Sequence, residues 1–374
     1  SESGFDTTLT IGVADRGDVM TSYVNGANTE FHADVELLGS GHTLTMNDGA
    51  ALGDGAVALH DNNLVVDGAG SASGHDVLTA ALAGTGDVDV NNAFLTVDRV
   101  NTFTGSWTAT GHTDLIFNAS ADDVSVSDLL GASGNTVVIG DEASVSMDED
   151  HGWTLTNNVS GNGHLHISAG GGEFQFADNG EPGADTVEDF TGTYHFTNST
   201  LTLNDTTSNL AGDVSFESGA TAVVGDGEYS LNDVAVENGG KLEFTGNIAP
   251  GHYDEENPSD TNLNAEGHIS ADSLTLAAGA QVEVDMDGLK VDPDDKPGEN
   301  VQLTAQDVLS EDESGLLTVL VTTEKGVSNN GAELVTGAPS EDSVTVDIVS
   351  NEEGVTDAKG TYDYALQVSE DGKE

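Results

Sequence analysis

The chain contains no cysteine and only 8 basic residues, against 67 acidic ones, in a length of 374. Without cysteine it can form no disulfide scaffold, no thiolate zinc site and no cysteine nucleophile. Its formal net charge of −59 repels phosphate groups, which excludes nucleic acid as a partner and disfavours anionic membrane surfaces. No run of about 18 apolar residues occurs, so we expect no direct insertion of this segment into a membrane.

Proline and aromatic residues are also scarce, with 6 prolines and 5% aromatics. A high net charge with few aromatics is typical of disordered chains. However, 36% of the residues are hydrophobic, and they form short clusters rich in β-branched side chains. The composition therefore predicts a folded all-β chain with an acidic surface.

Short strands with alternating apolar and polar residues recur along the chain, each closed by Gly, Asn or Asp. Examples are residues 42–46, 63–66, 93–97, 164–167 and 200–203. We find no sustained apolar pattern with the period of a helix. The even spacing of these strands favours many short turns of chain over two large sheets with long loops.

Some of these strands belong to degenerate repeats. A Phe-Thr-Gly-polar-aromatic segment occurs at residues 103–107 and again at 190–194, each followed by a strand. Repeats of strand and turn indicate a solenoid, in which each coil buries its apolar face only against its neighbours. We predict an all-β fold, a right-handed parallel β-helix; the alternative is a string of antiparallel sandwiches of about 100 residues each.

The composition changes near residues 248–264, where Pro250 and Pro258 flank an acidic cluster. Basic residues are concentrated beyond this point, so we place a domain boundary there. The first domain, residues 1–265, is the predicted parallel β-helix. The second, residues 266–374, is expected to be built differently.

Three segments of the second domain carry a family resemblance: residues 273–284, residues 315–321 with 332–335, and residues 360–366. They resemble the conserved C-terminal region of autotransporter passenger domains, the type V secreted proteins of Gram-negative bacteria, in the pertactin-like and self-associating branches. The resemblance implies that residues 266–374 form an autochaperone-like β capping region. It also implies a cell-surface or extracellular location, with anchoring by an outer-membrane barrel outside this chain.

The tripeptide Arg16-Gly17-Asp18 has the sequence of an integrin ligand. Such a ligand needs a protruding loop that presents the guanidinium and the carboxylate at opposite ends. The alternative is an ordinary turn between two strands, in which Gly and Asp are common. The residue pattern favours the turn.

Calcium is the one cofactor left open by the sequence, because hard cations prefer clustered carboxylate oxygens. Five aspartates crowd one loop: Asp285, Asp287, Asp292, Asp294 and Asp295. With 67 acidic residues, clusters arise by chance, and this loop does not match the twelve-residue calcium motif. A solvated run of charge is the favoured interpretation.

Catalysis is not expected. Parallel β-helices also build glycan-degrading enzymes with paired carboxylates, but acidic residues lie on nearly every predicted coil here, so a pair carries no information. The sequence has no Gly-x-Ser-x-Gly nucleophile motif. His164 and His166 share a strand face, a pair that is more often solvated than bound to a metal.

The resemblance implies an adhesin, because self-associating relatives pair two passengers head to tail through rows of polar residues. We expect a second copy of this chain as the partner, with cell aggregation and biofilm as the outcome. The alternatives are adhesion to a host matrix protein or glycan, and a polysaccharide-degrading β-helix enzyme. The residues expected to face outward and bind are Asn62, Asn91, Asn92, Asn118, Asn157, Asn158, Asn198 and Asn204, each of which could instead be a plain turn residue.

Overall fold

The fold was analysed in a computed structural model that describes residues 8–12, 19–71, 73–119, 124–177, 189–203, 210–225, 228–244, 268–277, 279–285, 303–310, 317–322, 335–336 and 344–349. The chain divides into two compact units, Ser1–His195 and Phe196–Glu374. Every strand pairing recorded between the named strands is parallel, and the described part contains a single short α-helix. The all-β parallel solenoid predicted from the repeats is thereby confirmed.

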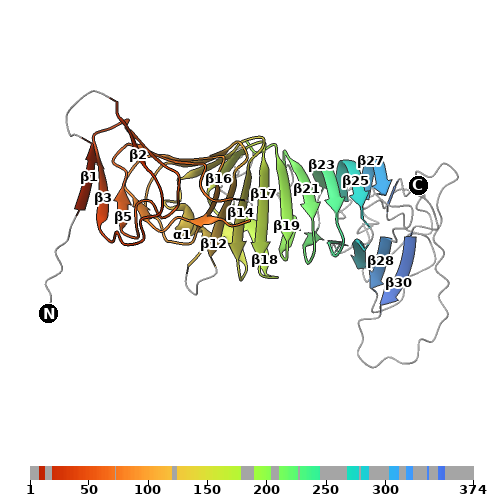
Figure 1. Ribbon diagram of the computed structural model, residues 1–374. Helices are drawn as coiled ribbons and strands as arrows, with labels where there is room; N and C mark the ends of the chain where they lie inside the picture. The colour runs from red at the N-terminus through yellow and green to blue at the C-terminus, as the bar shows by residue number, and fades with distance from the viewer. Residues whose placement is uncertain are drawn as a thin grey trace, which may run out of the picture. The chain divides into compact units, whose positions relative to one another are not determined.

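In the first unit the strands stack as successive coils (Figure 1). A four-stranded sheet has the order β1-β3-β5-β8, and a seven-stranded sheet has the order β16-β13-β11-β9-β6-β4-β2. The bounds in the first sheet are β1 Thr8–Gly12, β3 Asp34–Leu38, β5 Ala56–Ala58 and β8 Ala81–Ala83. Those in the second are β2 Thr21–Val24, β4 Thr43–Met46, β6 Asn63–Asp67, β9 Val88–Asn91, β11 Ser106–Thr110, β13 Thr136–Ile139 and β16 Asn158–Gly161.

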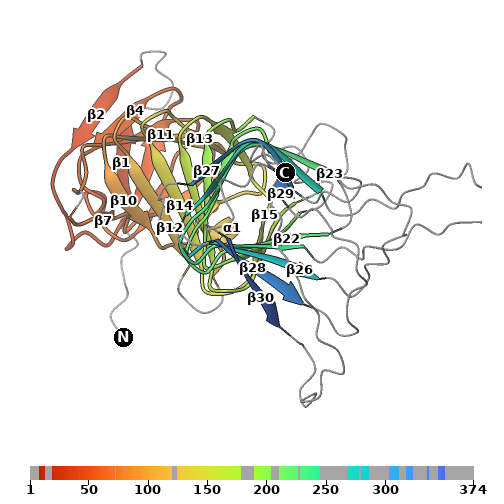
Figure 2. The same ribbon diagram turned by 90° about the vertical axis from the view of Figure 1, so that its right-hand side faces the viewer.

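A third sheet of the first unit, here called the β7–β19 sheet, has the order β19-β17-β14-β12-β10-β7. Its strands are β7 Asp76–Val77, β10 Phe94–Val97, β12 Asp114–Ala119, β14 Ser144–Glu149, β17 His164–Ala169 and β19 Thr193–Thr197, the strand within which the units divide. Strand β15 Trp153–Leu155 pairs with β18 Glu173–Phe176. Viewed towards one end of the solenoid, β11 and β13 lie on one wall and β12 and β14 on another (Figure 2).

The second unit continues the same pattern. One group of strands follows the order β29-β27-β25-β23-β21, and a second follows β20-β22-β24-β26-β28-β30. The first group comprises β21 Asp213–Phe216, β23 Glu228–Val236, β25 His268–Leu276, β27 Leu303–Ser310 and β29 Val335–Thr336. The second comprises β20 Thr200–Leu203, β22 Thr221–Val224, β24 Lys241–Phe244, β26 Gln281–Asp285, β28 Leu317–Thr322 and β30 Val344–Val349. The boundary predicted near residue 266 lies among residues 245–267, outside the described residues.

The core consists of columns of inward side chains, one from each coil. One column of the seven-stranded sheet is Leu44, Leu64, Val88, Trp107, Val137 and Val159, all at most 2% exposed. Alternation within each strand produces these columns, since successive side chains of a strand point to opposite faces. Full burial of each such side chain contributes about 1.5–3 kcal/mol to stability. The intervening polar residues remain on the outside of the coil.

The turns between strands also stack from coil to coil. In the second unit, Asn198, Gly219, Gly239 and Gly279 each adopt a positive φ, between 44° and 89°. Glycine and asparagine tolerate this left-handed conformation better than other residues. The amide of Gly219 donates to the carbonyl of Gly239, and that of Gly239 donates to Gly279. Asn198 is therefore a turn residue of this stack.

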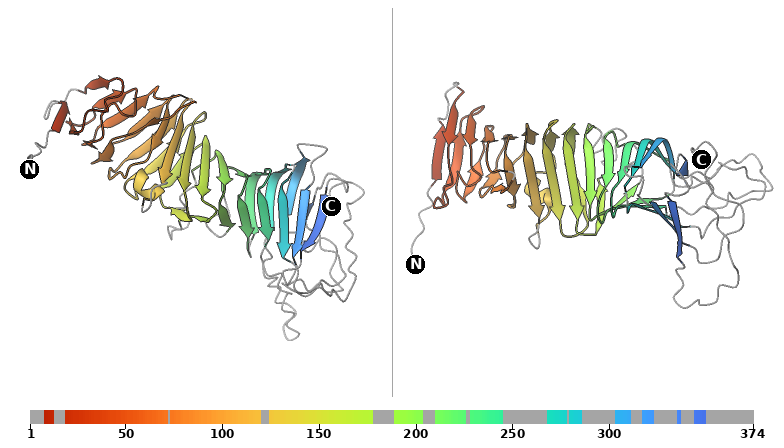
Figure 3. Two further views of the ribbon diagram at one scale, coloured as in Figure 1. Left: turned by 60° about the horizontal axis from the view of Figure 1, so that its bottom comes forward. Right: turned by 45° about the vertical axis from the view of Figure 1, so that its right-hand side comes forward.

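The one helix, α1 (Val126–Leu130), packs beside β12 and β14 (Figure 3). Ser125 caps its start: its hydroxyl accepts from the amide of Asp128, and the Asp128 carboxylate accepts from the amide of Ser125. This reciprocal pair satisfies two backbone donors at the helix start. Val126, Leu129 and Leu130 are buried against the coils.

Candidate functional site

The structure places the predicted binding asparagines in three different environments. Asn91 and Asn158 lie on the outer face of the seven-stranded sheet, in β9 and β16. Asn118 lies on the outer face of β12, and Asn92 and Asn198 are exposed turn residues with positive φ. Asn204, the tripeptide Arg16-Gly17-Asp18 and the aspartates 287, 292, 294 and 295 lie outside the described residues. Of Asp285 only the backbone is described, at the end of β26.

Asn62 and Asn157 do not face outward, and this part of the sequence interpretation is wrong. Both are 0% exposed. The Asn62 amide group donates to the carbonyls of Leu37, Gly39, Leu59 and His60, and its Oδ1 accepts from the backbone amide of His42 at 2.8 Å. The Asn157 amide donates to the carbonyls of Ala132 and Asn135, both at 3.2 Å. A buried side chain with these partners holds two coils together and cannot reach a ligand.

The same position in other coils carries the same chemistry. His42, Asn62, Asn135 and Asn157 each come directly before a strand of the seven-stranded sheet and are buried. Asn135 accepts from the amide of Gly105 at 2.9 Å and donates to the carbonyls of Phe103 and Leu130. His42 Nδ1 accepts from the amide of Met20 at 2.8 Å. Backbone amides and carbonyls in these turns lack hydrogen-bond partners in a neighbouring strand. The side chains of these four residues supply the missing hydrogen bonds. We call this set the inner polar ladder.

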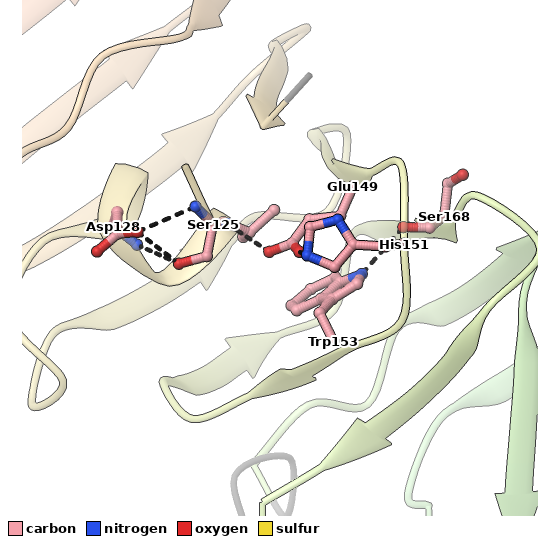
Figure 4. A network of polar contacts seen from close by, with 7 residues as sticks. Ser125, Asp128, Glu149, His151, Trp153 and Ser168 are labelled. Carbon is pink, nitrogen blue, oxygen red and sulfur yellow. Dashed lines mark hydrogen bonds and ion pairs between the residues drawn. The ribbon is translucent and has the colours of Figure 1, made fainter. Parts of the chain in front are cut away.

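A second buried polar group lies beside α1. Glu149 is at an inward position of β14, between Ala119 and Ala169 on the neighbouring coils, and its side chain is fully buried. Its Oε1 accepts from the backbone amide of Val126 at 2.5 Å, and its Oε2 lies 3.3 Å from Nε2 of the exposed His151. Figure 4 shows these groups with Trp153, whose Nε1 donates to the carbonyl of Ser168 at 3.0 Å. Glu149 thus joins α1 to the next coil.

Burial raises the pKa of Glu149, and the charge of Asp128 adds to this effect. The bond from Val126 and the charge of His151 partly offset it. An acid with a raised folded pKa binds more protons when folded than when unfolded, so its ionisation destabilises the fold as pH rises above the unfolded value of about 4.3. Glutamine keeps the acceptor for Val126 without the charge.

Glu149→Gln is therefore expected to raise the free energy of unfolding at pH 7, with the gain vanishing as pH falls to about 4. Urea denaturation at several pH values measures this difference. Glu142→Gln is the control, because the Glu142 side chain is 61% exposed and its contact with His112 is a long 3.8 Å. A gain that persists unchanged at pH 4 would show that ionisation of Glu149 is not the cause.

The outer face of the seven-stranded sheet carries a long set of aligned polar side chains. Its members in β4 to β16 are Thr43, Thr45, Asn63, Val65, Asp67, Asp89, Asn91, Ser106, Thr108, Thr110, Thr136, Val138, Asn158 and Ser160. We call this set the Thr/Ser/Asn face. Its side chains are half-buried or exposed, and they repeat about every 4.8 Å from coil to coil.

Charge is sparse on this face. Asp67 and Asp89 are its acidic members, in a chain with 67 acidic residues. Burial raises the pKa of Asp89, and the neighbouring charge of Asp87 raises it further, while a bond from Thr108 lowers it. The Asp87 carboxylate in turn accepts from both the amide and the hydroxyl of Ser106 at 2.8 Å. The face thus presents mainly hydroxyl, amide and methyl groups.

Many members of this face are threonines and serines, so a prediction based on asparagine alone does not find them. Asn63, and not Asn62, lies on the outer face: it is the first residue of β6 and alternates with the buried Leu64 and Val66. The hydroxyl residues Thr43, Thr45, Thr108 and Thr136 follow the same rule. Period-2 alternation was the signal that could have found them.

No protein-family model, curated protein or solved structure matches this chain. Within the described ranges, no group of three or more His, Asp or Glu side chains is placed to hold a metal ion. Among these same residues, no helix has the length and apolar character needed to span a bilayer.

Proposed function

We propose that this chain is the binding part of a bacterial cell-surface adhesin, and that two copies associate through the Thr/Ser/Asn face. The observation that carries this proposal is the alignment of hydroxyl and amide side chains over six consecutive strands, β4 to β16, with two acidic members. Hydroxyl and amide groups both donate and accept hydrogen bonds, so such a face is complementary to a second copy of itself. A C2 pair uses the same patch on both copies.

The composition of the face also addresses the repulsion between two strongly acidic chains. Two copies at −59 repel each other over the whole surface, but the local repulsion is smallest where carboxylates are few. Val65 and Val138 add apolar contact area between the polar rows. Long-range repulsion remains, and salt screens it, since the Debye length falls from about 10 Å at 0.1 M to about 3 Å at 1 M. Association should therefore increase with ionic strength.

Sedimentation velocity tests the proposal at about 0.1 M and about 1 M salt, the two ionic strengths for which the Debye lengths are given above. We expect monomers at low salt and dimers or larger species at high salt. Thr43→Glu combined with Thr136→Glu adds two charges to the face, next to Thr21 and Asn63 in one case and Ser106 and Asn158 in the other. This double variant should remain monomeric at both salt concentrations.

Thr96→Glu combined with Ser146→Glu is the matched control. Both are outward positions of the β7–β19 sheet, in β10 and β14, and the added charge is the same. This variant should associate at high salt as the wild type does. A wild-type chain that stays monomeric at both salt concentrations and at high protein concentration would contradict the proposal, as would equal association of the two double variants.

A further inference from the structure

A cluster of three histidines lies on the outer face of the β7–β19 sheet, away from the Thr/Ser/Asn face. His164 and His166 come from β17, and His195 comes from β19, the next strand of the sheet. His164 is exposed and the other two are half-buried. The sequence indicated the pair on β17, but only the fold brings the third ring to it, across 31 residues of chain.

The rings of this cluster have a defined arrangement. Nδ1 of His164 lies 3.1 Å from Nε2 of His195, within hydrogen-bond distance. His166 stacks on the ring of His195, with centroids 4.3 Å apart and ring planes inclined by 10°. Stacking of this kind restricts rotation of the His195 ring, so its Nε2 is held towards His164.

We propose that Nδ1 of His164 and Nε2 of His195 chelate one divalent transition-metal ion, such as Zn²⁺ or Cu²⁺. An ion at the usual zinc–nitrogen distance of about 2.05 Å from two nitrogens 3.1 Å apart subtends an angle of about 98°. This angle lies between the square-planar and tetrahedral values. The two nitrogens are therefore already at the separation that a shared ion requires.

Chelation requires both rings to be neutral and in matching tautomers. A neutral imidazole carries its hydrogen on either nitrogen, and chelation uses the tautomer with hydrogen on Nε2 of His164 and Nδ1 of His195, in which the two facing nitrogens are the ligand atoms. Among the described residues, no group of three or more metal-ligating side chains is found, so the proposed site rests on these two imidazoles. Imidazole prefers Zn²⁺, Cu²⁺ and Ni²⁺, whereas Ca²⁺ prefers oxygen ligands. The negative field of the chain concentrates cations near the surface but does not select among them.

Isothermal titration of the chelator-treated full chain, carrying no added histidine tag, with ZnCl₂ in excess CaCl₂ tests the site. Calcium occupies the carboxylates, which leaves the imidazole site for zinc. We expect one tight equivalent in the wild type and its loss in His164→Ala and in His195→Ala. His112→Ala is the control, because the His112 side chain is 79% exposed and lies in a different part of the coil, and it should keep the tight equivalent.

Electron paramagnetic resonance of one equivalent of Cu²⁺ gives a second readout, in which nitrogen coupling from two imidazoles is expected and is lost in His164→Ala. Circular dichroism verifies that each variant remains folded. Superimposable zinc titrations of the wild type and His164→Ala would overturn the proposal, as would a wild type without a tight equivalent. These titrations do not depend on self-association, so they can fail while the proposed function holds, and the reverse.

Discussion

Replacing Trp107 by alanine is expected to lower the free energy of unfolding of the first unit by about 3–5 kcal/mol, the range for large buried aromatic side chains. Trp107 is 0% exposed in the core column of the seven-stranded sheet. It makes edge-to-face contacts with Phe103 and Phe117, with centroids 5.5 and 5.1 Å apart. Its Nε1 also donates to the carbonyl of Leu130 at 3.1 Å, which ties the last turn of α1 to this coil.

Urea denaturation measures this loss, and the fluorescence of Trp153 reports it, because Trp153 also lies in the first unit and remains in the variant. Trp107→Phe keeps most of the apolar contact and loses only the bond to Leu130, whose carbonyl still accepts from the Asn135 amide at 2.8 Å. It should therefore cost about 0.5–1.5 kcal/mol, the net value of one hydrogen bond. Thr136→Ala, at an outward position of the adjacent strand, is the control. Equal losses for Trp107→Ala and Thr136→Ala would contradict the column packing described above.

The second large effect is expected at Asn62. Asn62→Asp keeps the shape of the side chain but replaces a donating amide by a carboxylate that faces four backbone carbonyls. An unpaired buried charge costs about 3–5 kcal/mol. Burial and the facing oxygens would raise the pKa of the introduced carboxyl, so the loss should appear as pH rises above about 3.9 and shrink below it.

Asn63→Asp provides a closely matched control, because it is the same substitution one position along the chain. Asn63 lies on the outer face of β6 and is half-buried, so the introduced carboxylate stays in contact with water. We expect a change within about 0.5 kcal/mol, as for ordinary surface substitutions. Urea denaturation of both variants at pH 4 and pH 7 separates the two positions. Equal losses of unfolding free energy for the two variants would mean that Asn62 does not belong to the inner polar ladder.

The strand alternation made the coils and their core predictable from the sequence. Residues such as Leu64 and Val66 in β6 recur with period 2, and parallel stacking then places them in columns with their counterparts in β4 and β9. The polar residues between coils were less predictable. Asn62 and Asn157 precede strands, where alternation does not apply, and their burial depends on turn carbonyls contributed by earlier coils.

Glu149 and His195 show a second limit. Alternation in β14 predicts that Glu149 points inward. The reason that a carboxyl group is tolerated there is the backbone amide of Val126 in α1, which donates to it, and the position of α1 is known only from the fold. His195 meets His164 across 31 residues, whereas Asn62 meets His42 across 20. Because coil length varies, the register between coils cannot be counted from the sequence, and the histidine cluster could not be predicted from it.

Cysteine cross-linking tests most directly whether a second copy covers the Thr/Ser/Asn face. The chain has no cysteine of its own, so each introduced cysteine is the only one in its variant. Single variants Thr45→Cys, Thr108→Cys and Thr136→Cys sample the length of the face, and Thr96→Cys on the β7–β19 sheet is the control. A disulfide requires Cα atoms within about 7 Å, so it reports direct pairing. We predict oxidised dimers at high salt for at least one face position and none for Thr96→Cys. Cross-linking of Thr96→Cys to the same extent, or no cross-linking at any face position, would contradict the account.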